Sequence, residues 1–108
     1  MVNKQLEKEE IIQVLKRNID EIKKFSVKRL GLFGSFSRNE QNEDSDLDFL
    51  VEFEEPSLRN FMGLNFFLEN LFARKVDLVT YRSLHELIKK RVLSEEVEVL
   101  WMKEMKFI

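Results

Sequence analysis

A short stretch in the first half of the chain holds residues whose types and spacing could do chemistry together. Gly34 and Ser35 follow an apolar run, and Asp46 and Asp48 alternate with apolar residues after a polar span. Backbone N–H groups at a Gly-Ser turn that opens a helix can bind an anion such as phosphate. Two carboxylates on one face of a strand repel each other unless a cation lies between them, and Mg2+ favours such oxygens. The pattern is typical of a phosphoryl-transfer or nucleotidyl-transfer site. The residues alone also fit a strand that starts with acids because it leaves a solvated turn, and a Gly-Ser pair is common at any tight turn.

Two further charged residues each admit two interpretations. Arg38 would project from the segment after the Gly-Ser turn, where a planar guanidinium matches phosphate oxygens, or it could pair on the surface with Glu40 or Glu43. Asp77 is a lone acid within the apolar run Val-Asp-Leu-Val. A charge in such a strand is costly unless its face is wet, paired or metal-bound. An edge strand with one side open to water would explain Asp77 equally well.

The combination of an apolar run, Gly34-Ser35, a spacer and Ser-Asp-Leu-Asp-Phe resembles the signature of the nucleotidyltransferase superfamily typified by DNA polymerase beta. It most resembles the minimal nucleotidyltransferase (MNT) domains found as antitoxins beside HEPN-domain toxins. Asn39 stands where that family often has glycine, and asparagine tolerates the same left-handed backbone. The resemblance favours a nucleotide contact for Arg38. It also implies that Asp77 supplies a third carboxylate and accepts the proton of the attacking hydroxyl.

This resemblance implies a complete catalytic site. The triphosphate of the nucleotide would be held by Gly34, Ser35 and Arg38. The catalytic and metal-binding residues would be three carboxylates, brought to one face by three strands and able to hold two Mg2+ ions: Asp46, Asp48 and Asp77.

The resemblance further implies a Mg2+-dependent transfer of AMP from ATP to a hydroxyl. The acceptor would be a tyrosine of a partner HEPN toxin, which would make this chain the antitoxin. Two alternatives belong to other classes. A non-catalytic binding module would neutralise its partner by occlusion, and a small-molecule enzyme would resemble antibiotic nucleotidyltransferases. The short chain weighs against the small-molecule enzyme.

Length and composition limit the number of domains and the kinds of site and partner that the chain can have. The chain has 108 residues, a formal net charge of −2 and no cysteine. We therefore expect a single domain over residues 1–108, without disulfides or thiolate metal sites. The charge balance gives no support for binding nucleic acid or an anionic membrane. The N-terminus is too charged for a signal peptide and no apolar run could span a bilayer, so the expected location is the cytoplasm.

The spacing of apolar residues predicts the elements that must position these side chains. The expected elements are a helix over residues 4–24, a strand over 27–33, a helical turn after Ser35, a strand carrying Asp46 and Asp48 and closed by Pro56, a helix from 57 or 58 to 72, a strand around 76–79, a helix capped by Ser83, and a strand over 97–101.

This order predicts an α/β (α+β) domain with a small mixed β-sheet. Its helices would pack mainly on one face, and the opposite face would be wet and acidic. The helix over 58–73 has more apolar residues than a one-sided helix needs. Either it is covered on both sides, or a surplus around Phe66 or Phe67 forms a partner surface. The apolar tail from Trp101 either packs back on the domain or docks against another chain, so a homo- or hetero-oligomer through either segment is possible.

Overall fold

The computed structural model describes residues 6–34, 45–83 and 98–101. Three helices, a 3-10 turn and four strands make up this part of the chain. In chain order they are α1 (Lys8–Arg17), α2 (Ile19–Lys23), β1 (Val27–Phe33), β2 (Leu47–Phe53), α3 (Leu58–Phe72), β3 (Val76–Thr80), the 3-10 turn (Tyr81–Ser83) and β4 (Glu98–Trp101).

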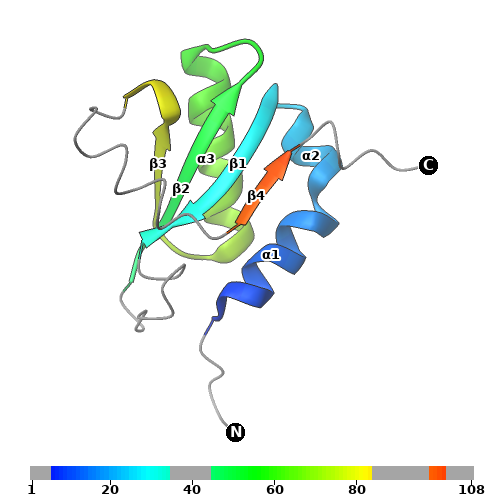
Figure 1. The fold of residues 1–108 in the computed structure, drawn as a ribbon, viewed down its shortest axis with the longest axis vertical. Helices are drawn as coiled ribbons and strands as arrows, with labels where there is room; N and C mark the ends of the chain where they lie inside the picture. Colours follow the sequence, from blue (N-terminus) through cyan, green and yellow to red (C-terminus); the bar gives the residue numbers. More distant parts are fainter. Residues whose placement is uncertain (1–5, 35–44, 84–97, 102–108) are drawn as a thin grey trace, which may run out of the picture.

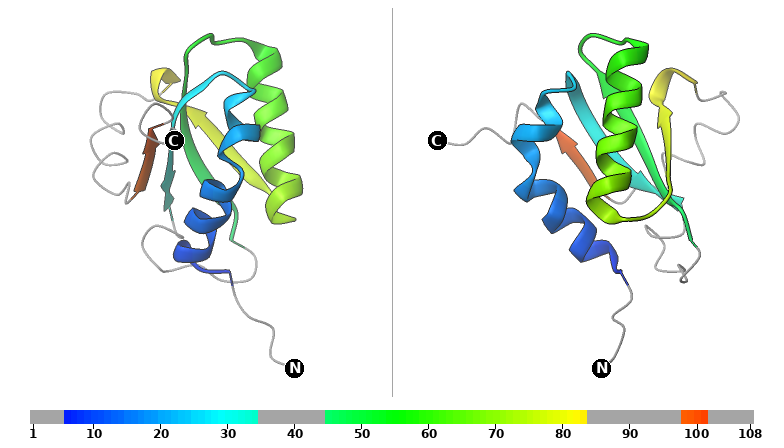
Figure 2. Two further views of the ribbon diagram at one scale, coloured as in Figure 1. Left: turned by 90° about the vertical axis from the view of Figure 1, so that its right-hand side faces the viewer. Right: turned by 180° about the vertical axis from the view of Figure 1, so that it is seen from behind.

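The strands form one mixed sheet in the order β3-β2-β1-β4. Strand β1 pairs antiparallel with β2 and with β4, whereas β2 and β3 are parallel and α3 connects them. The three helices lie together on one face of this sheet (Figures 1 and 2). The predicted mixed sheet with helices on one face is therefore confirmed.

The alternation along β2 explains which of its faces is covered. Leu47, Phe49, Val51 and Phe53 are buried in the main hydrophobic core, together with Leu64 and Leu68 of α3 and apolar residues of α1, α2 and β1. Because side chains alternate between the two faces of a strand, Asp48 projects from the opposite face. These four core positions thus turn Asp48 away from the helices.

The predicted first helix is in fact two helices. Leu6 and Glu7 precede the first helical turn, so α1 begins at Lys8 rather than at position 4. At Asn18 the backbone leaves the helical conformation, with φ −111° and ψ 20°. The Asn18 side-chain amide donates to the Val14 carbonyl at 2.8 Å. Asparagine side chains compete in this way for backbone hydrogen bonds, which explains the break that apolar spacing alone did not indicate.

Helix α3 begins where predicted. The Ser57 hydroxyl accepts a hydrogen bond from the Asn60 backbone N–H at 3.0 Å, which makes Ser57 the N-cap. The large apolar side chains exposed in the described part of the chain are Leu58, Met62 and Phe66, spaced four residues apart on α3. The apolar surplus expected on this helix is therefore present, and its use as a partner surface stays a prediction.

Phe67 belongs to the covered side of α3. Its ring packs against Phe25, with ring centroids 5.8 Å apart. Of the two phenylalanines named for the surplus, Phe66 is exposed, with 59% of its surface accessible, and Phe67 is half-buried.

Two predictions for the C-terminal third differ in outcome. Strand β4 coincides with the short strand expected over 97–101, beginning one residue later. The helix expected after Ser83 and the apolar tail beyond Trp101 lie outside the described residues. Within the described ranges, no helix has the length and apolar character needed to cross a membrane.

Candidate active site

Asp48 and Asp77 lie side by side in the sheet. They are register partners in the parallel pair formed by β2 and β3. Register partners on neighbouring strands are about 4.8 Å apart and project from the same face. Asp48 is half-buried and Asp77 is exposed. Two carboxylates far apart in the sequence are thus neighbours on the face opposite the helices.

Gly34 lies directly against the Asp48 carboxylate. It follows β1, whose last residue, Phe33, is the antiparallel partner of Asp48. Gly34 has φ +76°, a conformation that L side chains rarely adopt. A Cβ at this position would collide with Asp48 Oδ2 and would lie 3.0 Å from its Cγ. The glycine therefore lets the chain turn while its backbone stays in contact with the carboxylate.

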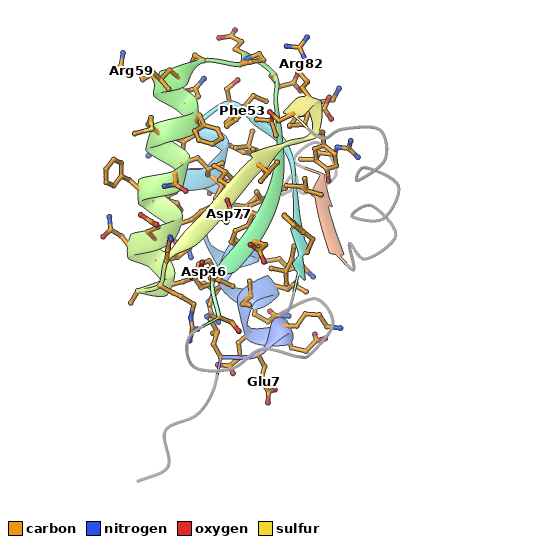
Figure 3. The ribbon with its side chains drawn as sticks, turned by 90° about the vertical axis from the view of Figure 1, so that its left-hand side faces the viewer. Glu7, Asp46, Phe53, Arg59, Asp77 and Arg82 are labelled. Atoms are coloured by element: carbon orange, nitrogen blue, oxygen red, sulfur yellow. The ribbon has the colours of Figure 1, made fainter. Side chains whose placement is uncertain are left out.

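Asp46 differs from its predicted position. It lies one residue before β2 and is not part of the strand, so strict alternation with Asp48 does not fix its direction. Figure 3 shows Asp46 at the start of β2 and Asp77 within β3. The three candidate carboxylates are therefore associated with two neighbouring strands and not with three, which corrects the expectation from the sequence.

The turn between α3 and β3 holds the segment that carries Asp46. The Arg74 guanidinium Nη1 donates to the Ser45 carbonyl at 2.9 Å. The Leu47 backbone N–H donates to the Lys75 carbonyl at 3.0 Å. Asp46 thus has a restrained residue on each side.

A second side chain from the same region holds the start of β3. Glu69 Oε2 accepts a hydrogen bond from the Val76 backbone N–H at 3.1 Å. Val76 directly precedes Asp77, as Ser45 directly precedes Asp46. Glu69 and Arg74 were not among the residues predicted for the site. The feature of the sequence that could have indicated them is a pair of charged residues at the end of an apolar helix, shortly before the strand that carries Asp77.

The described acidic residues do not form a ready-made site with three protein ligands. Among the described residues, no group of three or more His, Cys, Asp or Glu side chains could hold a metal ion. Mg2+ is commonly held by one or two carboxylates, with waters and substrate phosphates completing its coordination. Asp48 and Asp77 fit that second arrangement, because they place two carboxylates next to each other, one half-buried and one exposed to solvent.

Two of the predicted nucleotide-binding residues, Ser35 and Arg38, lie outside the described residues. Of the predicted site, the structure describes Gly34, Asp46, Asp48 and Asp77, and it brings Gly34, Asp48 and Asp77 together through strand pairing.

Glu52 shares the Asp48 face by alternation but has a different environment. Arg29 Nε approaches Glu52 Oε1 at 2.9 Å, and Lys28 Nζ lies 3.7 Å from Glu52 Oε2. The Arg29 guanidinium also stacks on the Tyr81 ring, 3.6 Å from its centroid. Glu52 is half-buried, and the ion pair with Arg29 gives it a structural role apart from the candidate site.

A pocket of about 550 Å³ lies next to this ion pair, where β2 and β3 end. Its lining includes Arg29, Glu52, Tyr81 and Arg82, and none of the described candidate acids. Figure 3 shows Arg82 and Asp46 toward opposite ends of the sheet. This pocket and the carboxylate pair are therefore separate.

Comparison with known sequences identifies the family. Residues 10–100 match the family described as "Nucleotidyltransferase domain". The chain is also similar to the protein adenylyltransferase MntA of Thermococcus cleftensis, with 47% identity over 93 residues. That alignment covers 84% of this chain and 94% of the relative.

Comparison with solved structures supports the same fold. A structure provisionally described as a minimal nucleotidyltransferase aligns with a TM-score of 0.74 and 32% identity, covering 89% of this chain and 99% of that one. A chain of a toxin–antitoxin crystal structure with AMP-PNP aligns with a TM-score of 0.58 and 26% identity. This second alignment covers 90% of the present chain and 73% of the other.

Proposed function

The chain belongs to the nucleotidyltransferase domain family, and we propose that it transfers AMP from ATP to a hydroxyl of a partner protein. The observation that carries this proposal is the placement of Asp48 beside Asp77 and against the Gly34 backbone. The similarity to a protein adenylyltransferase supports AMP as the transferred group and a protein as its acceptor.

In the proposed reaction, the acceptor oxygen attacks the α-phosphorus of ATP. The new oxygen–phosphorus bond forms while the bond between the α-phosphorus and the bridging oxygen to the β-phosphate breaks, and pyrophosphate leaves. Asp77 accepts the proton of the attacking hydroxyl, a task that suits an exposed carboxylate next to the reacting groups. The turn at Gly34 and Ser35 binds the triphosphate through backbone N–H groups, and Arg38 contributes its guanidinium.

Asp48 and Asp77, together with Asp46, would hold Mg2+ in this proposal. When bound, Mg2+ supplies positive charge that polarises the phosphates and stabilises the leaving group. The coordination would include phosphate oxygens and waters, in keeping with the two adjacent carboxylates.

The proposed acceptor is a tyrosine hydroxyl of a HEPN-domain toxin. The MNT signature of the sequence and the similarity to a chain of a toxin–antitoxin structure with AMP-PNP support this partner. The exposed apolar residues Leu58, Met62 and Phe66 are candidates for contacts with the toxin.

A decisive experiment compares two labelled forms of ATP. The chain is incubated with Mg2+, its co-expressed neighbouring protein and ATP labelled at either the α- or the γ-phosphate. We expect label from the α position alone on one protein band, and no label with Asp48→Asn. Mass spectrometry of that band would then locate the AMP group. Transfer from the γ position would identify a kinase, and no transfer from ATP or any other nucleoside triphosphate would refute an enzymatic role.

One observation favours a second function, neutralisation by occlusion alone. The described acidic residues form no three-ligand metal group. If occlusion is sufficient, an Asp48→Asn, Asp77→Asn double variant will protect cells from the toxin as well as the wild type does. The catalytic proposal requires that this variant bind the toxin but fail to protect.

A further inference from the structure

We propose that Glu69 and Arg74 are positioning residues that set the places of Asp77 and Asp46 relative to each other. This inference rests on the proposed function, because it concerns the carboxylates of that site. Both side chains come from the end of α3 and the turn that follows it. Each contacts the backbone of the residue directly before an aspartate, Val76 in one case and Ser45 in the other.

Arg74 acts across a long separation in sequence. Its guanidinium reaches the Ser45 carbonyl, which is 29 residues away along the chain, and this contact is partly buried. The neighbouring Lys75 carbonyl accepts from the Leu47 N–H. Because Asp46 lies outside the regular strand, strand pairing with β1 does not hold it. The Arg74 contact therefore restrains the segment that carries Asp46, the one candidate acid that has no register partner in the sheet.

Glu69 acts over a short separation but on the other strand. Its carboxylate accepts from the Val76 N–H, seven residues further on and partly buried. Val76 is also the register partner of Leu47. Glu69 thus acts on the strand position beside Leu47, and Arg74 acts on Ser45, two residues before Leu47. A shift of the α3–β3 turn would move the supports of both acids together.

The physical reason for such supports is the steep dependence of metal binding and transfer on geometry. Loss of a residue that orients metal ligands typically lowers metal affinity or activity about 10- to 100-fold. Displacements of about 1 Å can cost a similar factor in rate. We therefore expect removal of either side chain to weaken metal binding in a protein that still folds.

Two pairs of variants separate the effect of losing the hydrogen bond from the effect of changing the size of the side chain. Arg74→Met removes the donor and keeps the length, whereas Arg74→Lys restores a donor. Glu69→Leu removes the acceptor, whereas Glu69→Gln keeps a side-chain oxygen that can accept from the Val76 N–H. Rescue by Lys and by Gln is the expected signature of positioning.

Ser57→Ala is the matched control. It removes a helix cap from the opposite end of α3, where the Ser57 hydroxyl accepts from the Asn60 N–H. It should lower the thermal midpoint as the Met and Leu variants do, but it should leave the site geometry unchanged.

The readout is the affinity for Mn2+ in the presence of a non-hydrolysable ATP analogue, measured by electron paramagnetic resonance. Hydrogen exchange of the Leu47 and Val76 amides is measured on the same samples. We expect the Met and Leu variants to bind Mn2+ about 10- to 100-fold more weakly, with faster exchange at these amides, while Ser57→Ala binds as the wild type does.

Equal Mn2+ affinity in the wild type and in Arg74→Met and Glu69→Leu would overturn the proposal, as would failure of the wild type to bind Mn2+. An equal loss in Ser57→Ala would also overturn it, because the effect would then follow from stability alone. A wild type that binds Mn2+ with the analogue but transfers no label would refute the proposed function, while the comparison of affinities would still decide the positioning role.

Discussion

Gly34 and Asp48 are in such close contact that position 34 has no room for a side chain. The backbone there has φ +76°, and an added Cβ would collide with the Asp48 carboxylate. Asp48 is in turn the register partner of Asp77. The turn after β1 is therefore in contact with the paired acids of β2 and β3. We expect a substitution at position 34 to displace these carboxylates.

We expect Gly34→Ala to lower both stability and transfer activity. A left-handed backbone costs an alanine about 1–2 kcal/mol, and the methyl group would displace Asp48. The free energy of unfolding from urea titration and the rate of AMP transfer measure the two effects. Gly63→Ala is the control, because its Cβ would meet the Phe25 ring at 2.7 Å on the helix side of the sheet. An equal loss of activity in both variants, relative to the folded fraction, would contradict a specific role for the Gly34 contact.

Asp48→Asn and Asp77→Asn should each abolish most of the transfer while leaving the fold intact. Each change is isosteric and removes one of two neighbouring negative charges, so stability should be unchanged or higher. Loss of a general base lowers rates about 10²- to 10⁴-fold, which is the effect expected for Asp77. Glu52→Gln is the control, since Glu52 shares the face of Asp48 but pairs with Arg29. A wild-type rate in Asp77→Asn would exclude Asp77 as the base.

The Arg29–Glu52 pair should contribute to stability and not to transfer. We expect a double-mutant cycle of Arg29→Met and Glu52→Gln to give a coupling energy of about 0.5–1 kcal/mol, the upper part of the range for exposed pairs. The value is modest because the two side chains are 24% and 36% exposed. Chemical denaturation of the four proteins supplies the measurement. A coupling near zero would mean that the contact with Tyr81, and not the ion pair, holds Arg29 in place.

Two substitutions on α3 should differ sharply in their cost. Leu64 is fully buried, so Leu64→Ala should lower the free energy of unfolding by about 2–5 kcal/mol. Phe66 is 59% exposed, so Phe66→Ala should change it by no more than about 0.5 kcal/mol. Thermal unfolding of both variants checks the contrast. A large loss in Phe66→Ala would show that this ring is covered in solution.

Local patterns in the sequence were sufficient for much of the fold. The bounds of β1 were predicted correctly, because an apolar run ended by Gly34 is a local signal. The start of α3 followed from the hydroxyl of Ser57, which caps the next turn. The alternation in β2 indicated that Asp48 faces away from the core. The break at Asn18 was missed because a side chain that competes for backbone hydrogen bonds leaves the apolar spacing unchanged.

The sequence indicates which residues belong to the candidate site, and the tertiary structure decides how they are arranged. Residue types and the family signature singled out Gly34, Asp46, Asp48 and Asp77 from the chain alone. Only the tertiary structure decided that Asp48 and Asp77 are register partners, because the register of two strands separated by a helix depends on how that helix packs. The supports from Glu69 and Arg74 likewise depend on where the end of α3 meets the sheet. Sequence determined which groups can do the chemistry, and packing decided which of them meet.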